Sequence, residues 1–563
     1  MQTVVQPSHE AVEVAHKTSE KNKFGDETIE VDSITTRDGD TVRKLQPRHV
    51  ALIGIGGTIG TALFVAIGSA LTAGGPASLL IAFIIWSSVI WGVNNAMSEM
   101  VTWLPINSGF IRLAGRFVDE ALGVAAGWNF FVCEAALVAF EVTACCVIVR
   151  FWDVDGSIHK AVWIAIILAL YSLLNLITVE YYGESEFWFA IGKVLLITAL
   201  ICMTFVLMVG GNPKGDAFGF RYWKNPGAFA EYIEKGSMGR FLGFFQCLVT
   251  ASFVIAGPDY LSMAAGEAIN PRKTMPEAYR VVFARLVAFF VLGSLAVGII
   301  VPYNDPSLLK AIGDGKPGAA KSPYVIALTR LEVPVLPHII NAAVLLSAFS
   351  AGNSYVFCAS RTLYGLSLEG KAPRIFTKCS KRGVPYNSVI MVLAIGLLAF
   401  LSVSKNANIV LTWFVSIVTS SQLINFAIMT FTYLRFYKAM EVQGISRSEL
   451  PYRSRFNPYT AYYSLTAITL MIFLQGYSVF IKGQWDVSNF LFAYFMVGVT
   501  PAIYLVWKLV KRTKWLALRD VDLFTGKKEI DEDELMWKEL EAAGKLHQGK
   551  ARKGWSQIRK FLF

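Results

Sequence analysis

Three carboxylates lie inside strongly apolar stretches of this 563-residue chain, where a charge is costly. Glu134 and Glu141 are seven residues apart in one stretch, and Asp259 lies in a later one. A helix of 3.6 residues per turn places the two glutamates on one stripe, two turns apart. Because a charge at membrane depth costs roughly 2.5–3.5 kcal/mol, such acids usually face a cavity or a partner. The acids predict an internal site for a cationic group; a gate or a helix-packing hydrogen bond is the alternative role for either glutamate.

Lys193 places an ammonium group in the interior of the fifth apolar stretch. Burial disfavours the charged form of a lysine, so a lysine in this place can load and release a proton. The alternative is that its long side chain extends to the nearby membrane surface and keeps its charge in water.

The first apolar stretch contains the sequence IGIGGTIG at residues 53–60, glycine-rich in the middle of a membrane helix. We expect the helix to unwind there, and the freed backbone groups must then line a polar cavity. The N–H groups of Gly56, Gly57 and Thr58, with the positive end of the following half-helix, would bind a carboxylate. A packing face formed by Gly56 and Gly60 is the alternative.

A second interruption, VIAGPDY at residues 254–260, falls in the sixth apolar stretch. Proline lacks the N–H and clashes with the preceding turn, at about 3 kcal/mol or more in a helix interior. Paired interruptions in equivalent helices predict a transporter site between two inverted repeats. A simple kink at Pro258 is the alternative.

The composition places these residues in a membrane protein. The chain is 54% hydrophobic and 17% charged, with a mean hydropathy of +0.48. Runs of about twenty apolar residues match the roughly 30 Å of hydrocarbon that a helix must cross. We predict twelve such crossings, at residues 49–69, 77–102, 123–149, 161–179, 187–209, 241–262, 281–301, 338–360, 387–403, 407–433, 460–481 and 487–507.

The positions of Lys and Arg predict the orientation. With twelve crossings, the side that carries both termini collects 37 basic residues and the opposite side 13. Basic residues favour cytoplasmic loops, so we expect both termini in the cytoplasm. Residues 1–48 lack the pattern of a cleaved signal peptide, and the first crossing is expected to act as the signal. The net charge of +11 is then mainly a topology signal, and nucleic-acid binding gains no support.

The cysteines and histidines do not indicate a metal site or an enzyme. The seven cysteines and six histidines show no CxxC, HxxxH or HExxH spacing, and the cysteines resemble apolar packing residues. No GxxxxGK[ST] sequence is present. We therefore expect no metal, no cofactor and no enzyme activity, and any uphill transport must use an ion gradient.

We divide the chain into a largely disordered cytoplasmic tail at 1–48, a twelve-helix domain at 49–510 and a second cytoplasmic tail at 511–563. The C-terminal tail contains an acidic, helix-like stretch around Glu529–Glu541. Both tails are long enough for regulatory partners, although their composition fits solvated tails equally well. A non-transporting nutrient receptor that signals through its tails is therefore a rival to a carrier.

A long ordered series of motifs resembles the fungal amino-acid permeases of the amino acid–polyamine–organocation superfamily, over roughly residues 43–512. The markers are GIGGTIGTALFVAIG at 54–68, GGPAS at 74–78, EMVTWLP at 99–105, GWNFF at 127–131, Phe140-Glu141, YYGESEFW at 181–188, AGEAINPRKTMPEA at 265–278, SAFSAGNSYVFCASRTLYGLSLEGKAPRIF at 347–376 and SQLINF at 421–426.

The resemblance implies an all-α, LeuT-like fold of five plus five inverted helices and two more, with discontinuous helices 1 and 6. It implies that carbonyls around Ala256 and Gly257 hold the substrate amino group. Lys193 matches the lysine taken to replace a sodium ion in sodium-coupled relatives. Pro258-Asp259 departs from the commoner Thr-Glu, and its acid is one methylene shorter.

TALFVAIG at 61–68, SFVIAG at 252–257, SPYVIA at 322–327 and LPYRS at 450–454 resemble general amino-acid permeases of a type that also imports carnitine and is linked to polyamines. A proline-specific permease is the alternative. A trimethylammonium group needs aromatic faces and acids, for which Phe140, Phe253, Tyr260 and Trp128 are candidates. The predicted substrate-binding residues are Gly56, Gly57, Thr58, Cys133, Glu134, Glu141, Phe253, Ala256, Gly257 and Asp259.

These inferences combine into one expected function. The chain would be a multi-pass plasma-membrane permease that imports amino acids, and carnitine or polyamines, together with protons by alternating access. Its partners would be small zwitterionic or cationic substrates, protons, the lipid bilayer and regulatory proteins on the tails.

Overall fold

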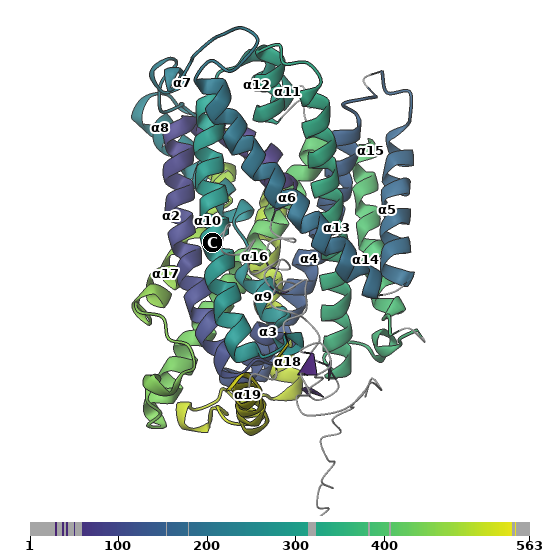
Figure 1. The fold of residues 1–563 in the computed structure, drawn as a ribbon, viewed down its shortest axis with the longest axis vertical. Helices are drawn as coiled ribbons and strands as arrows, with labels where there is room; N and C mark the ends of the chain where they lie inside the picture. The colour runs from purple at the N-terminus through teal and green to yellow at the C-terminus, as the bar shows by residue number, and fades with distance from the viewer. Residues whose placement is uncertain are drawn as a thin grey trace, which may run out of the picture.

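The computed structural model is almost entirely helical over the residues it describes (Figure 1). These are residues 59–153, 155–177, 179–313, 322–380, 383–404 and 407–542, together with Val50, Gly54 and four strands of two residues each. The long helices are α2 (Ile67–Trp103), α4 (Glu120–Val149), α5 (Lys160–Ile177), α6 (Val179–Met208), α8 (Gly236–Val254), α10 (Pro271–Ile300), α13 (Leu336–Leu368), α14 (Tyr386–Gly396), α16 (Ala407–Val442), α17 (Tyr459–Leu474) and α18 (Val487–Lys511).

Shorter elements connect the long helices. The short helices are α3 (Gly109–Phe117), α7 (Arg221–Lys224), α9 (Pro258–Met263), α11 (Pro306–Gly313), α12 (Pro323–Arg330), α15 (Leu401–Ser404) and α19 (Lys527–Ala542), and a π-helical turn, Ala62–Ala66, leads into α2. Strand β1 (Ile29–Glu30) pairs in parallel with β4 (Leu546–His547), and β2 (Arg37–Asp38) pairs antiparallel with β3 (Thr41–Val42).

The long helices form a bundle with two distinct ends. In Figure 1, α7, α11 and α12 lie at one end and α3 and α19 at the other, while α6 crosses the bundle obliquely. We call these the α12 end and the α19 end. Helix α4 is central, packed against α13, α16 and α18, and 89% of its most apolar window is buried, against 17% for α18. Exposed apolar side chains on α18 suit contact with lipid.

Eight helical stretches of the described chain are long and apolar enough to cross a membrane, and three shorter apolar helices accompany them. The first stretch, Ala62–Trp103, has 42 residues and would be about 63 Å long as one helix, twice the hydrocarbon thickness. Gly75 divides it, because its backbone leaves the helical conformation at φ +79° just before Pro76. The division falls between two predicted crossings, 49–69 and 77–102.

A glycine is required at position 75. A Cβ there would lie 2.7 Å from the Ala230 nitrogen and 2.8 Å from the Ala228 carbonyl oxygen. The flanking residues bond to the same segment, since Ala230 N–H donates to the Gly74 carbonyl and Ala77 N–H to the Ala228 carbonyl. The bend therefore sits tightly against the loop that precedes α8.

Helical structure also stops between α8 and α9. Helix α8 ends at Val254, Ile255 is extended, Gly257 has φ +145°, and α9 begins at Pro258. Pro258 has no N–H, so the carbonyl of Val254 loses the donor that a continuous helix would supply. The three residues 255–257 therefore expose main-chain polar groups inside the bundle.

Glu99 anchors the α19 end of α2 and is fully buried. Its carboxylate accepts hydrogen bonds from Tyr433 (2.7 Å), Arg447 Nη2 (2.5 Å), the Ser454 N–H (2.8 Å) and Asn457 Nδ2 (3.1 Å). Every such donor lowers the cost of burying the charge. Glu99 is thus a structural acid with its acceptor sites filled.

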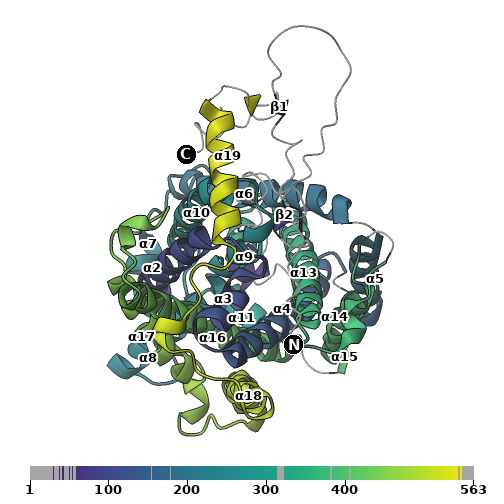
Figure 2. The same cartoon turned by 90° about the horizontal axis from the view of Figure 1, so that it is seen from below.

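Helix α19, which coincides with the acidic stretch of the C-terminal tail, lies across the end of the bundle (Figure 2). The Arg272 Nη1 atom, at the start of α10, lies 2.5 Å from an Asp531 oxygen and 2.6 Å from Glu534 Oε2. Trp537 is buried against Ile269. The segment before α19 is also fixed, because the Trp103 indole N–H donates to the Leu523 carbonyl.

The two acids of α19 that contact Arg272 carry shifted pKa values. Burial raises the pKa of Asp531, but bonds and charges from Lys527 and Arg272 outweigh it, so the pKa lies below its ordinary value. The pKa of Glu534 is lowered in the same way, by Lys538 and Arg272 against burial. A carboxylate with a lowered pKa in the docked state stabilises docking at neutral pH, and that contribution is lost as the pH falls through the lowered pKa values.

We predict that the D531N/E534Q double variant releases α19 at neutral pH, because Arg272, whose side chain is 6% exposed, is left buried without an anionic partner. The protection of the amides of residues 527–542 against hydrogen exchange, relative to the intrinsic exchange rate at each pH, should fall, as it should in the wild type at acid pH. The control is Glu532→Gln, which removes an ion pair at the surface. Its partner Lys528 has a side chain that is 88% exposed, and the Lys528 Nζ atom lies 3.8 Å from Glu532 Oε1. Unchanged exchange in the double variant would show that these ion pairs do not hold the helix.

Candidate functional site

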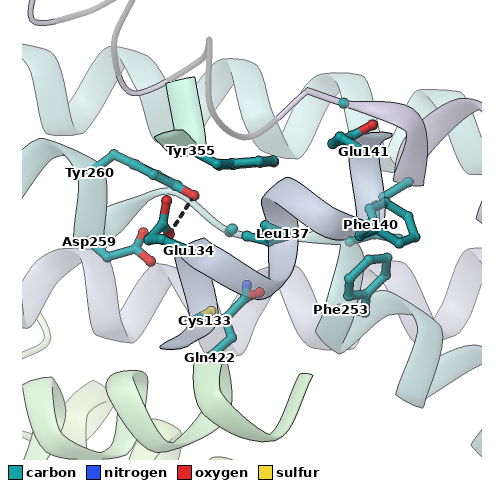
Figure 3. A pocket seen from close by; sticks show the side chains of 14 residues that line it. Cys133, Glu134, Leu137, Phe140, Glu141, Phe253, Asp259, Tyr260, Tyr355 and Gln422 are labelled. Atoms are coloured by element: carbon teal, nitrogen blue, oxygen red, sulfur yellow. Dashed lines mark hydrogen bonds between the residues drawn. The ribbon is translucent and has the colours of Figure 1, made fainter. Parts of the chain in front are cut away.

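One cavity lies in the interior, where α4 faces the break between α8 and α9. Its walls come from α4, the start of the segment that leads into α2, the α8–α9 break, α13 and α16 (Figure 3). The lining residues are Gly60, Ala62, Cys133, Glu134, Leu137, Phe140, Glu141, Phe253, Val254, Ala256, Asp259, Tyr260, Tyr355 and Gln422. None of these described lining residues is Lys, Arg or His, so the ionisable charge of the wall is negative.

Two acids lie at one end of the cavity. Glu134 is 1% exposed; its Oε1 accepts a hydrogen bond from the Tyr260 hydroxyl at 2.9 Å. Its Oε2 has no hydrogen-bond partner among the described residues. Asp259 approaches the same end (Figure 3), and its Oδ1 accepts the Gly257 N–H at 3.3 Å. In contrast to Glu99, this pair retains unfilled acceptor capacity, which a ligand with N–H donors can fill.

Glu141 lies at the other end and is tied to the first helical segment. Its Oε1 accepts the Thr61 N–H at 3.2 Å, and its Oε2 accepts a short hydrogen bond from the Thr61 hydroxyl. A carboxylate beside the first N–H groups of a helix also interacts favourably with the helix dipole. Gly60 makes the approach possible, because a Cβ at this position would lie 2.5 Å from Glu141 Oε1. Glu141 therefore joins α4 to the start of the segment after the first predicted break.

Aromatic rings frame both ends. The rings of Phe140 and Phe253 meet edge to face with centroids 5.5 Å apart, and those of Tyr260 and Tyr355 are 6.5 Å apart. Trp128 lies elsewhere, since it does not line the cavity and its indole N–H donates to the Lys371 carbonyl at the end of α13. The expectation that Trp128 belongs to the aromatic set is wrong for this structure, because that hydrogen bond fixes it away from the site.

Six of the predicted binding residues surround this cavity: Cys133, Glu134, Glu141, Phe253, Ala256 and Asp259. Gly257 forms the break itself. Gly56, Gly57 and Thr58 lie outside the described residues. Lys193 does not line the cavity; it is 2% exposed on α6, and its charge interacts with Glu141.

Sequence reasoning missed two polar lining residues, Tyr355 and Gln422. Gln422 Nε2 donates to the Ile255 carbonyl at 3.4 Å and so covers one freed backbone group of the break. Both lie in quoted motifs, SAFSAGNSYVF and SQLINF. No local pattern assigned them to the break, because α13 and α16 reach it only through tertiary packing.

The comparisons with known proteins agree with this architecture. The profile of the Amino acid permease family matches residues 49–519. The chain belongs to the amino acid permease family. It is therefore a multi-pass membrane transporter rather than an enzyme.

The similarity to individual relatives covers most of the chain. It is 45% identical to General amino acid permease AGP2 of Saccharomyces cerevisiae, over 87% of this chain and 82% of the relative. It is 41% identical to the proline-specific permease of Emericella nidulans, over 93% and 95% of the two chains. A solved manganese transporter of Eremococcus coleocola shares the fold with a TM-score of 0.50 and 13% identity, over 82% of this chain and 94% of that one.

We predict that Gly60→Ala lowers transport roughly tenfold, because the new methyl group displaces the Glu141 carboxylate from Thr61 and overpacking costs about 1–3 kcal/mol. Initial uptake rate per surface-delivered molecule is the measurement. Gly192→Ala is the matched control, since a Cβ there meets no atom within 4 Å. Equal rates for both variants would contradict the tight contact between Gly60 and Glu141.

Proposed function

We propose that this permease imports amino acids, with a range that extends to carnitine and polyamines, by proton-coupled alternating access. The observation that carries the proposal is the incompletely bonded Glu134 beside Asp259, in a cavity that also borders a helix break. Buried acids without full bonding are costly unless a cation joins them. A substrate ammonium would therefore lie at this end of the cavity.

The carbonyls around Ala256 and Gly257 would support the same orientation, because carbonyl oxygens also attract a cationic group. The substrate carboxylate would bind at the other end, to N–H groups of Gly56, Gly57 and Thr58. Phe140, Phe253 and Tyr260 could pack against a trimethylammonium group. Substrates with a second carboxylate fit poorly, because the described wall carries only acidic charge.

A proton gradient would supply the driving force. One charge moved through 100 mV is worth about 2.3 kcal/mol, which at 1.4 kcal/mol per decade supports an accumulation of roughly fortyfold before any pH difference is added. Lys193 is the proposed proton-coupling residue, since it is buried and its charge interacts with Glu141.

The proposal includes the plasma membrane as the location, twelve crossings with repeats of five helices, and both termini in the cytoplasm. The proposal also includes the division of the chain into a cytoplasmic tail at 1–48, a twelve-helix domain at 49–510 and a second cytoplasmic tail at 511–563. Under this orientation the α19 end of the bundle faces the cytoplasm, where regulatory proteins could reach the tails.

A proline-specific permease is the second candidate, favoured by the similarity to proline-specific permeases of Emericella nidulans and Saccharomyces cerevisiae, at 41% and 40% identity. The family assignment leaves the non-transporting nutrient receptor without support. Uptake into reconstituted vesicles tests transport directly, because a receptor binds substrate but does not accumulate it.

We predict that arginine and carnitine compete with labelled proline for uptake, and that Glu134→Gln weakens the competition by arginine roughly ten- to hundredfold. A hydrogen bond to a charged group contributes about 1.5–3 kcal/mol, and the isosteric Gln removes only that charge. Glu332→Gln, at a side chain that is 72% exposed, is the control. Uptake confined to proline would favour the proline-specific permease, and unchanged competition would exclude Glu134 from the cation site.

We predict that Lys193→Ala uncouples uptake from external pH, because the proposed proton-coupling residue is removed. Exchange of substrate across the vesicle membrane should continue without accumulation. Lys528→Ala, at an exposed position of α19, controls for loss of a lysine. Full pH dependence in the Lys193→Ala variant would contradict its role.

A further inference from the structure

We propose that Glu186 is the group that binds the transported proton and passes its charge state to Lys193. The proposal rests on the proposed proton coupling and adds a residue to it. Glu186 lies on α6, seven residues before Lys193, so a helix places the two on one stripe. Its side chain is 5% exposed, and it is not part of the cavity lining.

The two oxygens of Glu186 differ in their bonding. Oε2 accepts a hydrogen bond from the Ser350 hydroxyl of α13 at 3.2 Å. Oε1 is buried and has no hydrogen-bond partner among the described residues. A buried carboxylate oxygen without a donor is unfavourable as an anion, and a proton on that oxygen relieves the cost.

Glu141 differs from Glu186, because each of its oxygens accepts a hydrogen bond from Thr61 and these bonds favour the ionised form. Lys193 interacts with both carboxylates. If all three groups are charged, the buried cluster carries one net negative charge. One added proton makes it neutral, and Glu186 Oε1 is the described acceptor position that remains open. The cluster is therefore suited to take up one proton.

Among the side chains that the structure describes, few other charges act on Glu186. The groups that act on it are Lys193 on its own helix and the hydroxyls of Ser350 and Ser354 on α13. Cys358 of α13 also faces it. Helix α5 contributes Asn175, which donates to Asn353 Oδ1 at 2.7 Å, and α10 packs against α6 as well. The charge on Lys193 is influenced by Glu186 and Glu141.

The position of Glu186 explains how a proton could alter the site without entering it. When Glu186 is ionised, Lys193 is held between two carboxylates. When a proton from water binds Oε1, the attraction on that side disappears, while the attraction between the ammonium and Glu141 remains. Glu141 contacts the start of the first helical segment through Thr61, so the change reaches the cavity wall. Release of the proton to water on the opposite side reverses it.

The test compares wild type, Glu186→Gln and Glu186→Asp in proteoliposomes with an imposed pH gradient. Glu186→Gln mimics the protonated carboxyl, and we expect it to exchange substrate at a near-normal rate, to lose accumulation, and to show a flat pH profile. Glu186→Asp restores an ionisable group and should regain part of the accumulation. Gradient-driven accumulation and a wild-type pH profile in Glu186→Gln would overturn the proposal.

A milder variant covers the case in which Glu186→Gln fails to fold. Ser350→Ala removes the donor to the ionised carboxylate, so the pH of half-maximal uptake should rise by roughly half to one unit. An unchanged pH profile in this variant would contradict the proposal.

The wild type shows which proposal has failed. If wild-type uptake does not depend on the pH gradient, the proposed proton coupling fails and the role of Glu186 fails with it. If the pH gradient drives accumulation equally in the wild type and in Glu186→Gln, the role of Glu186 is refuted and the proposed proton coupling stands.

Discussion

The structure depends on one constraint: a main chain that leaves the helical conformation inside a bilayer must find partners within the protein. Residues 255–257 impose this requirement, because Pro258 removes a donor and Gly257 adopts φ +145°. The neighbouring helices meet it by enclosing the break, with Gln422 of α16 donating to the Ile255 carbonyl. The same enclosure creates the cavity, since the backbone groups that it shields from lipid remain available to a ligand.

The buried acids divide into two kinds according to their bonding. Glu99 and Glu141 accept hydrogen bonds at both oxygens and join helices together. Glu134 and Glu186 each keep one oxygen without a partner in the described chain. A buried carboxylate oxygen without a donor is costly as an anion, and a ligand or a proton can relieve that cost. The first kind positions the helices, and the second kind provides sites for a substrate cation and a proton.

The sequence alone predicted the helical class, the family and the acids on one stripe of α4, because these follow from composition, motifs and helical spacing. It did not reveal Tyr355 or Gln422, which reach the cavity by the packing of α13 and α16. Glu186 was overlooked because the polar stretch YYGESEFW precedes the predicted crossing at 187–209, whereas α6 begins at Val179. The contact of α19 with Arg272 is equally invisible to local patterns, because it joins residues about 260 positions apart.

The most direct test is an electron cryo-microscopy structure of the permease with arginine bound. The account predicts density for the ligand in the cavity, with a cationic group directed at Glu134 and Asp259, and a helix that stays interrupted at residues 255–257. A continuous helix from α8 into α9, or arginine bound away from both acids, would contradict it.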